Sequence, residues 1–135
     1  MANKHKPRKR IDAECFRLVD GTGKIRAKLD VVQGDAALRM YDDWGSIRLK
    51  ADVDANGTPS LTLYDGNSEV RVFIKIQPDG RVGLGILGEH GEPQLGLGVD
   101  ADKPLLVVHD PSGACVRMTV SIVDGRLHFE EEHQP

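Results

Sequence analysis

The residues that could carry catalysis or hold a metal are scattered along this 135-residue chain. None of its five histidines lies in a pattern with serine, cysteine or aspartate that predicts a nucleophile and its general base. Residues 52–57 follow the first half of a calcium loop, D-x-D-x-N-G, but Leu63 stands at the twelfth position in place of glutamate. The same letters are typical of a hairpin turn. We therefore expect no enzymatic activity and no cofactor.

The two cysteines, Cys15 and Cys115, lie a hundred residues apart and match no zinc-binding spacing. The charged start of the chain has no apolar segment after it, and no apolar run reaches the ~18 residues of a membrane span. These features predict a cytoplasmic protein with reduced thiols. A disulfide between the first and last hairpins is the alternative.

Basic residues are concentrated in the first part of the chain. Residues 1–50 hold twelve Lys and Arg against seven Asp and Glu, whereas residues 51–135 hold six against fourteen. Phosphate contacts need only charge and reach, so these cations predict an anion-binding surface for nucleic acid or an acidic protein. The candidate residues are Lys4, Lys6, Arg8, Lys9, Arg10, Arg17, Arg26, Arg39 and Arg48. The alternative is a solvated arm, together with arginines that Asp30, Asp52 and turn carboxylates neutralise.

A strip of glycines in the segment GLGILGEHGEPQLGLGV is the second candidate site. Its members stand where other segments carry outward-facing side chains, so another backbone or a flat surface can approach closely. The residues are Gly83, Gly85, Gly96 and Gly98. A bend required for curvature is the alternative. No strand–helix unit surrounds these glycines, which argues against a dinucleotide-binding loop.

Both candidate sites lie on an internal repeat. Its turn residues recur at intervals of 22, 23, 23 and 22, as Asp20, Asp42, Asp65, Gly88 and Asp110. An arginine follows each turn except the fourth, where Gln94 replaces it; these arginines are Arg26, Arg48, Arg71 and Arg117. Apolar and polar residues alternate with a period of two in every copy, which is the pattern of a β-strand with one apolar face.

The repeat predicts an all-β fold, an antiparallel up-and-down meander of five hairpins with ten or eleven strands and almost no helix. Two turns per copy favour this fold over the alternative, a parallel β-solenoid with one coil per copy. Face parity favours four-residue loops such as residues 42–45, with Tyr41 opposite Ser46. In the fifth copy the apolar set arrives one residue late, so we expect a longer loop or a bulge there. The repulsive pairs in this register are Arg17 with Arg26 and Arg39 with Arg48.

The apolar face needs a cover, and the chain predicts no helix to supply one. The sheet must close into a barrel, collapse into a sandwich, or stack against the sheets of other copies. The apolar positions include no polar anchor for a ligand. We therefore favour a packed interior or an oligomer interface over a small hydrophobic-ligand carrier built as a β-barrel.

The pattern L-x-L-x-D-x-x-G-x-x-R, seen in FRLVDGTGKIRA and LRMYDDWGSIRL, resembles the repeats of poorly characterised bacterial and phage-associated β-repeat proteins. The resemblance covers about residues 15–127. It implies a structural repeat and transfers no activity and no site residues. The fourth copy departs from the pattern because it lacks both the aspartate and the arginine.

Three segments are predicted: a flexible basic N-terminal arm at 1–14, a β-repeat domain at 15–129 and an acidic tail at 130–135. The favoured function is that of a non-enzymatic scaffolding or self-assembling protein, a homo-oligomer formed through the apolar face or the glycine strip. The alternative is a nucleic-acid or polyanion-binding protein that uses the arm and the arginine face.

Overall fold

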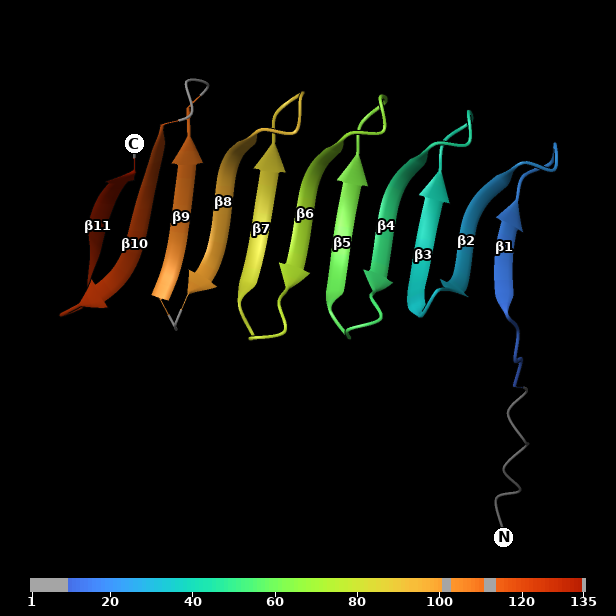
Figure 1. Ribbon diagram of the computed structural model, residues 1–135, viewed down its shortest axis with the longest axis horizontal. Helices are drawn as coiled ribbons and strands as arrows, with labels where there is room; N and C mark the ends of the chain where they lie inside the picture. Colours follow the sequence, from blue (N-terminus) through green and yellow to red (C-terminus); the bar gives the residue numbers. More distant parts are fainter. Residues whose placement is uncertain (1–9, 101–102, 111–113, 135) are drawn as a thin grey trace, which may run out of the picture.

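The computed structural model describes residues 10–100, 103–110 and 114–134, and this part of the chain contains strands and turns but no helix. The strands are β1 (Cys15–Val19), β2 (Ile25–Val32), β3 (Asp35–Tyr41), β4 (Ile47–Val53), β5 (Pro59–Tyr64), β6 (Val70–Ile76), β7 (Val82–Leu87), β8 (Pro93–Asp100), β9 (Lys103–His109), β10 (Cys115–Val123) and β11 (Arg126–Gln134). They form one eleven-stranded sheet in sequence order (Figure 1). Every neighbouring pair is antiparallel. The predicted meander is confirmed, and the parallel solenoid is wrong.

Two kinds of turn join the strands. Two-residue turns with positive φ at both positions connect β2 to β3 and β10 to β11, as at Gln33 (54°) and Gly34 (92°). The other kind spans five residues, as in 42–46, where Asp42 N–H donates to the Ser46 carbonyl and Gly45 N–H to the Asp42 carbonyl. Residues 54–58 and 77–81, which return the chain from one copy to the next, form the same pair of bonds.

A β-bulge follows the repeat turn in the first four copies. Tyr41 pairs with Ile47 and Met40 with Leu49, so Arg48 is the extra residue. The prediction that Tyr41 lies opposite Ser46 is therefore wrong. The predicted repulsive pairs are also wrong, because Arg17 lies opposite Lys28 and Arg39 opposite Lys50.

The fifth copy accommodates its late apolar residues in a different way. Cys115 pairs with His109 and Val116 with Val108, with no shift of register between them. Asp110 N–H donates to the Ala114 carbonyl, as the first residue of the other five-residue turns does to the last. The expected longer loop or bulge is wrong, because the turn has five residues, as the others do. Without a bulge after it, Val116 pairs directly with Val108 on the apolar face. Arg117 consequently lies opposite Val107 and not at a bulge.

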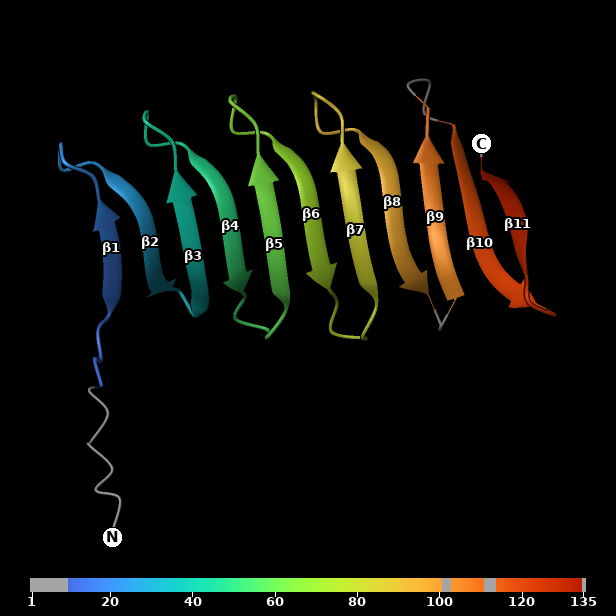
Figure 2. The same ribbon diagram turned by 180° about the vertical axis from the view of Figure 1, so that it is seen from behind.

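The sheet is a single open layer whose edges are β1 and β11 (Figures 1 and 2). From β1 to β9 the axes of the strands lie at similar angles in both views (Figures 1 and 2). This part of the sheet therefore accumulates little twist. The sheet encloses no interior, so the expected closure of this sheet into a barrel is wrong. Strand β11 also continues through residues 130–134, which the sequence assigned to an acidic tail.

Three rows of side chains cross the sheet on its apolar face. The turn-side row, nearest the repeat turns, is Leu18, Ala27, Met40, Leu49, Leu63, Val72, Ile86, Leu95, Val108 and Val116. The middle row is Phe16, Leu29, Leu38, Ala51, Leu61, Ile74, Leu84, Leu97, Leu106 and Met118. The return-side row is Val31, Ala36, Val53, Pro59, Ile76, Val82, Val99 and Pro104.

Nothing in the described part of the chain covers these rows. Leu18 is 64% exposed and Leu97 47% exposed. Among the described residues the buried hydrophobic side chain is Ala37, which lies on the opposite face between Asp30 and Asp52. Side chains on the polar face, such as Ala37 and Asp30, are therefore less exposed to solvent than the leucines of the apolar face.

Candidate functional site

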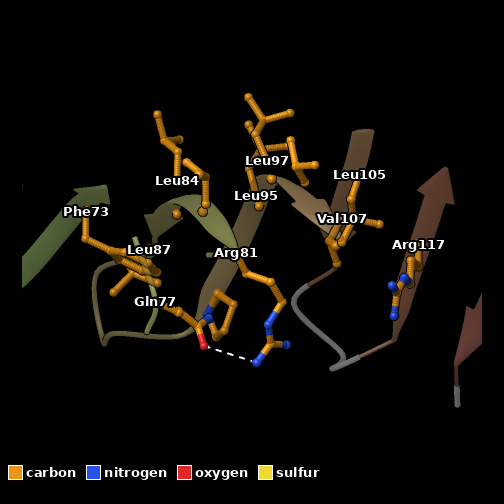
Figure 3. Close-up of a pocket in the computed structure, with 17 residues that line it drawn as sticks. Phe73, Gln77, Arg81, Leu84, Leu87, Leu95, Leu97, Leu105, Val107 and Arg117 are labelled. Carbon is orange, nitrogen blue, oxygen red and sulfur yellow. Dashed lines mark hydrogen bonds between the residues drawn. The ribbon is translucent and has the colours of Figure 1, made fainter. Parts of the chain in front are cut away.

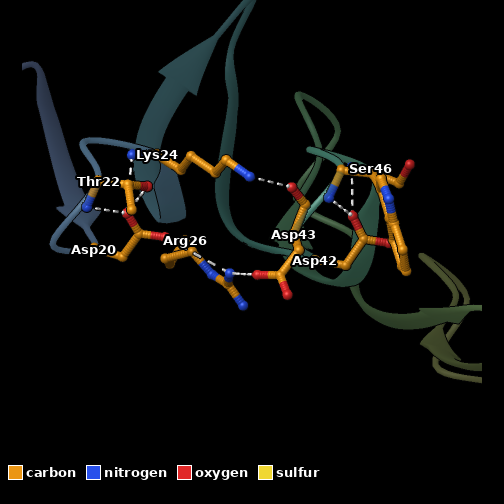
Figure 4. Close-up of polar contacts among 8 residues, drawn as sticks. Asp20, Thr22, Lys24, Arg26, Asp42, Asp43 and Ser46 are labelled. Atoms are coloured by element: carbon orange, nitrogen blue, oxygen red, sulfur yellow. Dashed lines mark hydrogen bonds and ion pairs between the residues drawn. The ribbon is translucent and has the colours of Figure 1, made fainter.

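The repeat motif D-x-x-G-x-x-R is a turn organised around one carboxylate (Figure 4). Asp42 Oδ1 accepts the N–H groups of Trp44 at 3.0 Å and Ser46 at 2.9 Å. The bulge lets Arg48 point back at the same side chain, with Nη1 3.8 Å from Asp42 Oδ2. This geometry explains the repeat without any ligand.

The first and third copies repeat these contacts. Asp20 accepts N–H groups from Thr22 and Lys24, and its partner Arg26 lies 3.8 Å away. The corresponding ion pair of Arg71 with Asp65 measures 3.5 Å. Hydrogen bonds from the Thr22 hydroxyl and backbone lower the pKa of Asp20.

The fourth copy replaces the missing aspartate with a carboxylate from elsewhere in the turn. Glu92 Oε2 accepts the His90 N–H at 2.9 Å, the bond that an aspartate at position 88 would receive. A Cβ on Gly88 would lie 1.7 Å from Glu92 Oε1, so Glu92 occupies the space of the missing side chain. Backbone hydrogen bonds lower the pKa of Glu92. The departure from the repeat is therefore compensated within the turn by Glu92.

The polar face of β1 to β4 carries a row of four cations in register. These residues are Arg17, Lys28, Arg39 and Lys50. Asp30 lies in the adjacent row, 7% exposed, and binds Lys28 Nζ at 2.6 Å and Arg39 Nη1 at 2.5 Å. The hydrogen bond from Lys28 lowers the pKa of Asp30, and the same contact raises the pKa of Lys28.

Asp52 is the carboxylate that neutralises Lys50, the last cation of this row. Its carboxylate binds Lys50 Nζ at 2.7 Å and accepts the Ser60 hydroxyl at 2.5 Å. Burial alone would raise the pKa of Asp52, but the bonds from Lys50 and Ser60 outweigh it and lower the pKa. Most of the predicted anion-binding arginines are thus engaged within the protein. Arg17 makes no ion pair with any residue that the structure describes.

The remaining basic candidates belong to the N-terminal arm. Lys4, Lys6, Arg8 and Lys9 lie outside the described residues. Arg10 is exposed and pairs with Asp12 at 2.9 Å. The structure therefore places one arm cation, and that cation already has a carboxylate partner.

A hollow between the first two repeat turns brings cations and aromatic rings together. Its lining includes Arg17, Lys24, Lys28, Tyr41 and Trp44, together with the acidic residues Asp42 and Asp43. Trp44 is 89% exposed. Asp43 pairs with Arg26 and offers its carbonyl to Lys24 Nζ at 3.1 Å, which ties the two turns together (Figure 4).

The glycine strip is the floor of a shallow groove on the polar face, about 360 Å³ in volume (Figure 3). Phe73 forms one wall, Val107 and Arg117 lie on the other side, and Leu84 and Leu97 point to the opposite face. The strip is not open along its whole length. The Phe73 ring lies over Gly85, where a Cβ would come within 2.3 Å of Cε1.

Sequence reasoning missed Phe73 as the cover of this glycine. Phe73 alternates with apolar-face residues in its own strand, so its place on the polar face was visible. Its position directly opposite Gly85 required the register between β6 and β7. Gly98 is explained by backbone contact, since a Cβ there would lie 2.7 Å from the Val82 carbonyl oxygen.

The remaining candidates take part in ordinary structure. Cys15 and Cys115 are free thiols on β1 and β10, so the alternative disulfide is wrong. In the segment that resembles a calcium loop, Asp54 accepts the N–H groups of Asn56 and Thr58, and thereby holds a turn. Within the described ranges no group of three or more His, Cys, Asp or Glu side chains is placed to hold a metal.

No protein-family model matches the chain, and no curated protein matches it significantly. No helix in the described residues has the length and the apolar character that a membrane crossing demands.

Proposed function

We propose that this chain is a non-enzymatic, self-assembling structural protein whose copies cover one another's apolar faces. The observation that carries the proposal is the apolar face itself, which extends over the sheet without any covering layer in the described residues. Monomeric proteins rarely expose an apolar patch of more than a few hundred Å².

The dimensions of the sheet support this proposal. The ten strands β1 to β10 carry the apolar rows, and at a spacing of ~4.8 Å and a width of ~20 Å they give a face of roughly 950 Å² per copy. A stable interface needs about 800 Å² from each partner. Flat sheets of many strands are usually stabilised by stacking. Both the area and the small twist therefore favour contact between faces.

A pair of neighbouring substitutions tests the proposal. Leu63 lies in the turn-side row, whereas Thr62 lies on the polar face beside Lys50 and Phe73. Light scattering should give the wild type and Thr62→Asp the same mass, a multiple of 14.8 kDa. Leu63→Asp should lower that mass, because its carboxylate would be buried without a partner. A wild-type mass of one chain at all concentrations would end the proposal.

A second candidate function, polyanion binding, is supported by the hollow that Arg17, Lys28, Tyr41 and Trp44 line. A phosphate contact with Arg17 and base stacking on the exposed Trp44 are the interactions that such a site offers. Binding to single-stranded DNA should weaken steeply as salt increases, and Arg17→Ala should reduce the slope. Absence of binding at low salt would remove this candidate.

A further inference from the structure

We infer that the assembly is a closed trimer, in which three sheets form the walls of a triangular prism with their apolar faces inward and their strands across the long axis. This inference rests on the proposed function, since it names the number and arrangement of the copies that cover the face. The polar faces, with the cation row and the glycine groove, would then lie outside.

Strand length sets the width of each wall. Strands β3, β4, β5, β6, β7 and β9 contain six or seven residues, which is roughly 20–23 Å at ~3.3 Å per residue. The centre of an equilateral triangle with sides of that length lies about 6 Å from each side. Sheets that pack face to face lie ~10 Å apart, so each covers a depth of about 5 Å. Three walls of this width therefore leave a space that one layer of side chains per wall can fill.

The size of the side chains changes across the strands in the way that a triangular interior requires. Leucine occupies six of the ten positions in the middle row, which would face the axis, and four of ten in the turn-side row. From β2 to β9 the return-side row holds eight residues, of which none is leucine and four are valine. Both outer rows would lie at corners, and in a threefold arrangement the short return-side residues of one wall would meet the turn-side residues of the next wall.

Two parallel walls would be filled less well by the same side chains. A two-sheet sandwich keeps its walls at a constant separation of ~10 Å, so it needs side chains of similar size in every row. Short side chains along the return side would leave gaps, and unfilled volume is destabilising. A threefold arrangement also closes on itself, so a fixed number of copies completes the assembly.

The mass of the wild-type protein in solution tests the inference and separates it from the proposed function. Native mass spectrometry should give three times 14.8 kDa, about 44 kDa, as the main species. A dimer or a series of larger species would overturn the prism and leave self-assembly standing. A monomer would overturn both.

Two substitutions on β8 give a second test, in which the measured quantity is the strength of trimer association and not its complete loss. Val99 lies in the return-side row and Leu97 in the middle row, and both are more than 40% exposed in the single chain. Val99→Leu should weaken the trimer about ten-fold or more, because the corner has no room for the added carbon. Leu97→Val should weaken it through a gap at the axis. Unchanged or tighter association of Val99→Leu would contradict the triangular interior.

Discussion

At the scale of single residues, the turn aspartates have a role that their neighbours lack. Asp42 accepts two backbone N–H groups, whereas Asp43, the next residue, is an exposed partner of Arg26. Asp42→Ala should lower the free energy of unfolding by about 1–2 kcal/mol, because two N–H groups lose their acceptor. Asp43→Ala removes the same charge and should cost less than about 0.5 kcal/mol. Urea denaturation of the two variants measures the difference, and equal losses would contradict the assigned role.

The carboxylates of the polar face predict a loss of stability in acid. Contacts with Lys28, Thr22 and the Glu69 backbone lower the pKa values of Asp30, Asp20 and Asp65 below those of the unfolded chain. A lowered pKa in the folded state contributes stability above the unfolded value of about 4, and this contribution disappears as the pH falls through the folded value.

The free energy of unfolding should therefore be nearly constant from about pH 7 to pH 5 and should fall below about pH 4. Asp30→Asn should be less stable at neutral pH, because Lys28 and Arg39 lose their shared partner. Its stability should also depend less on pH in the acid range. Denaturation curves across this range supply the measurement, and an identical acid dependence of wild type and Asp30→Asn would refute the assignment.

At the scale of the strands, the glycines of β7 and β8 differ in how much space surrounds them. A Cβ on Gly98 would lie 2.7 Å from the Val82 carbonyl oxygen, whereas one on Gly83 would meet its nearest neighbour, the Leu97 carbonyl oxygen, at 4.0 Å. Gly98→Ala should destabilise the sheet by about 1–3 kcal/mol because backbone must move. Gly83→Ala should be neutral or slightly stabilising. Thermal unfolding of both variants tests this order, and the reverse order would contradict the register of β7 and β8.

The strands and their faces could be predicted because the repeat spacing and the alternation of residues depend on local sequence. The register at the repeat turns could not. Pairing Met40 with Leu49 instead of Ile47 shifts the strand by two residues, and a two-residue shift leaves the side chains from Leu49 onward on the same face. Alternation therefore cannot choose between the two registers. The choice depends on the hydrogen bonds from Asp42 and on the bulge at Arg48.

The candidate sites were predicted less completely, since they depend on contacts between strands. The sequence named Asp30 and Asp52 as carboxylates that could neutralise the arginines, but the particular contact of Asp30 with Arg39 is diagonal and depends on the register between β2 and β3. The cover of Gly85 by Phe73 has the same origin. The replacement of the fourth turn aspartate by Glu92 requires a side chain to fold back on its own turn.

At the scale of the whole molecule, the two faces of the sheet differ. Charged groups of the polar face find partners within the chain, whereas the aliphatic side chains of the apolar face stay exposed. Carboxylates and cations on the polar face neutralise one another and bury Asp30 and Ala37. The apolar face holds the side chains that normally drive folding, yet most of its leucines and valines keep a large exposed fraction in the single chain. Burial of this face between copies would supply the missing hydrophobic stabilisation, at ~25 cal/mol per Å².

The most direct measurement is the reactivity of single cysteines on the two faces in solution. Leu63→Cys and Thr62→Cys are made separately in a chain whose two native thiols are removed by Cys15→Ser and Cys115→Ser. The rate at which a maleimide modifies the single remaining thiol is then measured. The account predicts that Cys at 63 reacts at least about ten-fold more slowly than Cys at 62, and that low concentrations of urea, which separate the copies, remove the difference. Equal rates in native buffer, with the folded sheet intact, would show that the apolar face is open to water and would contradict the central claim.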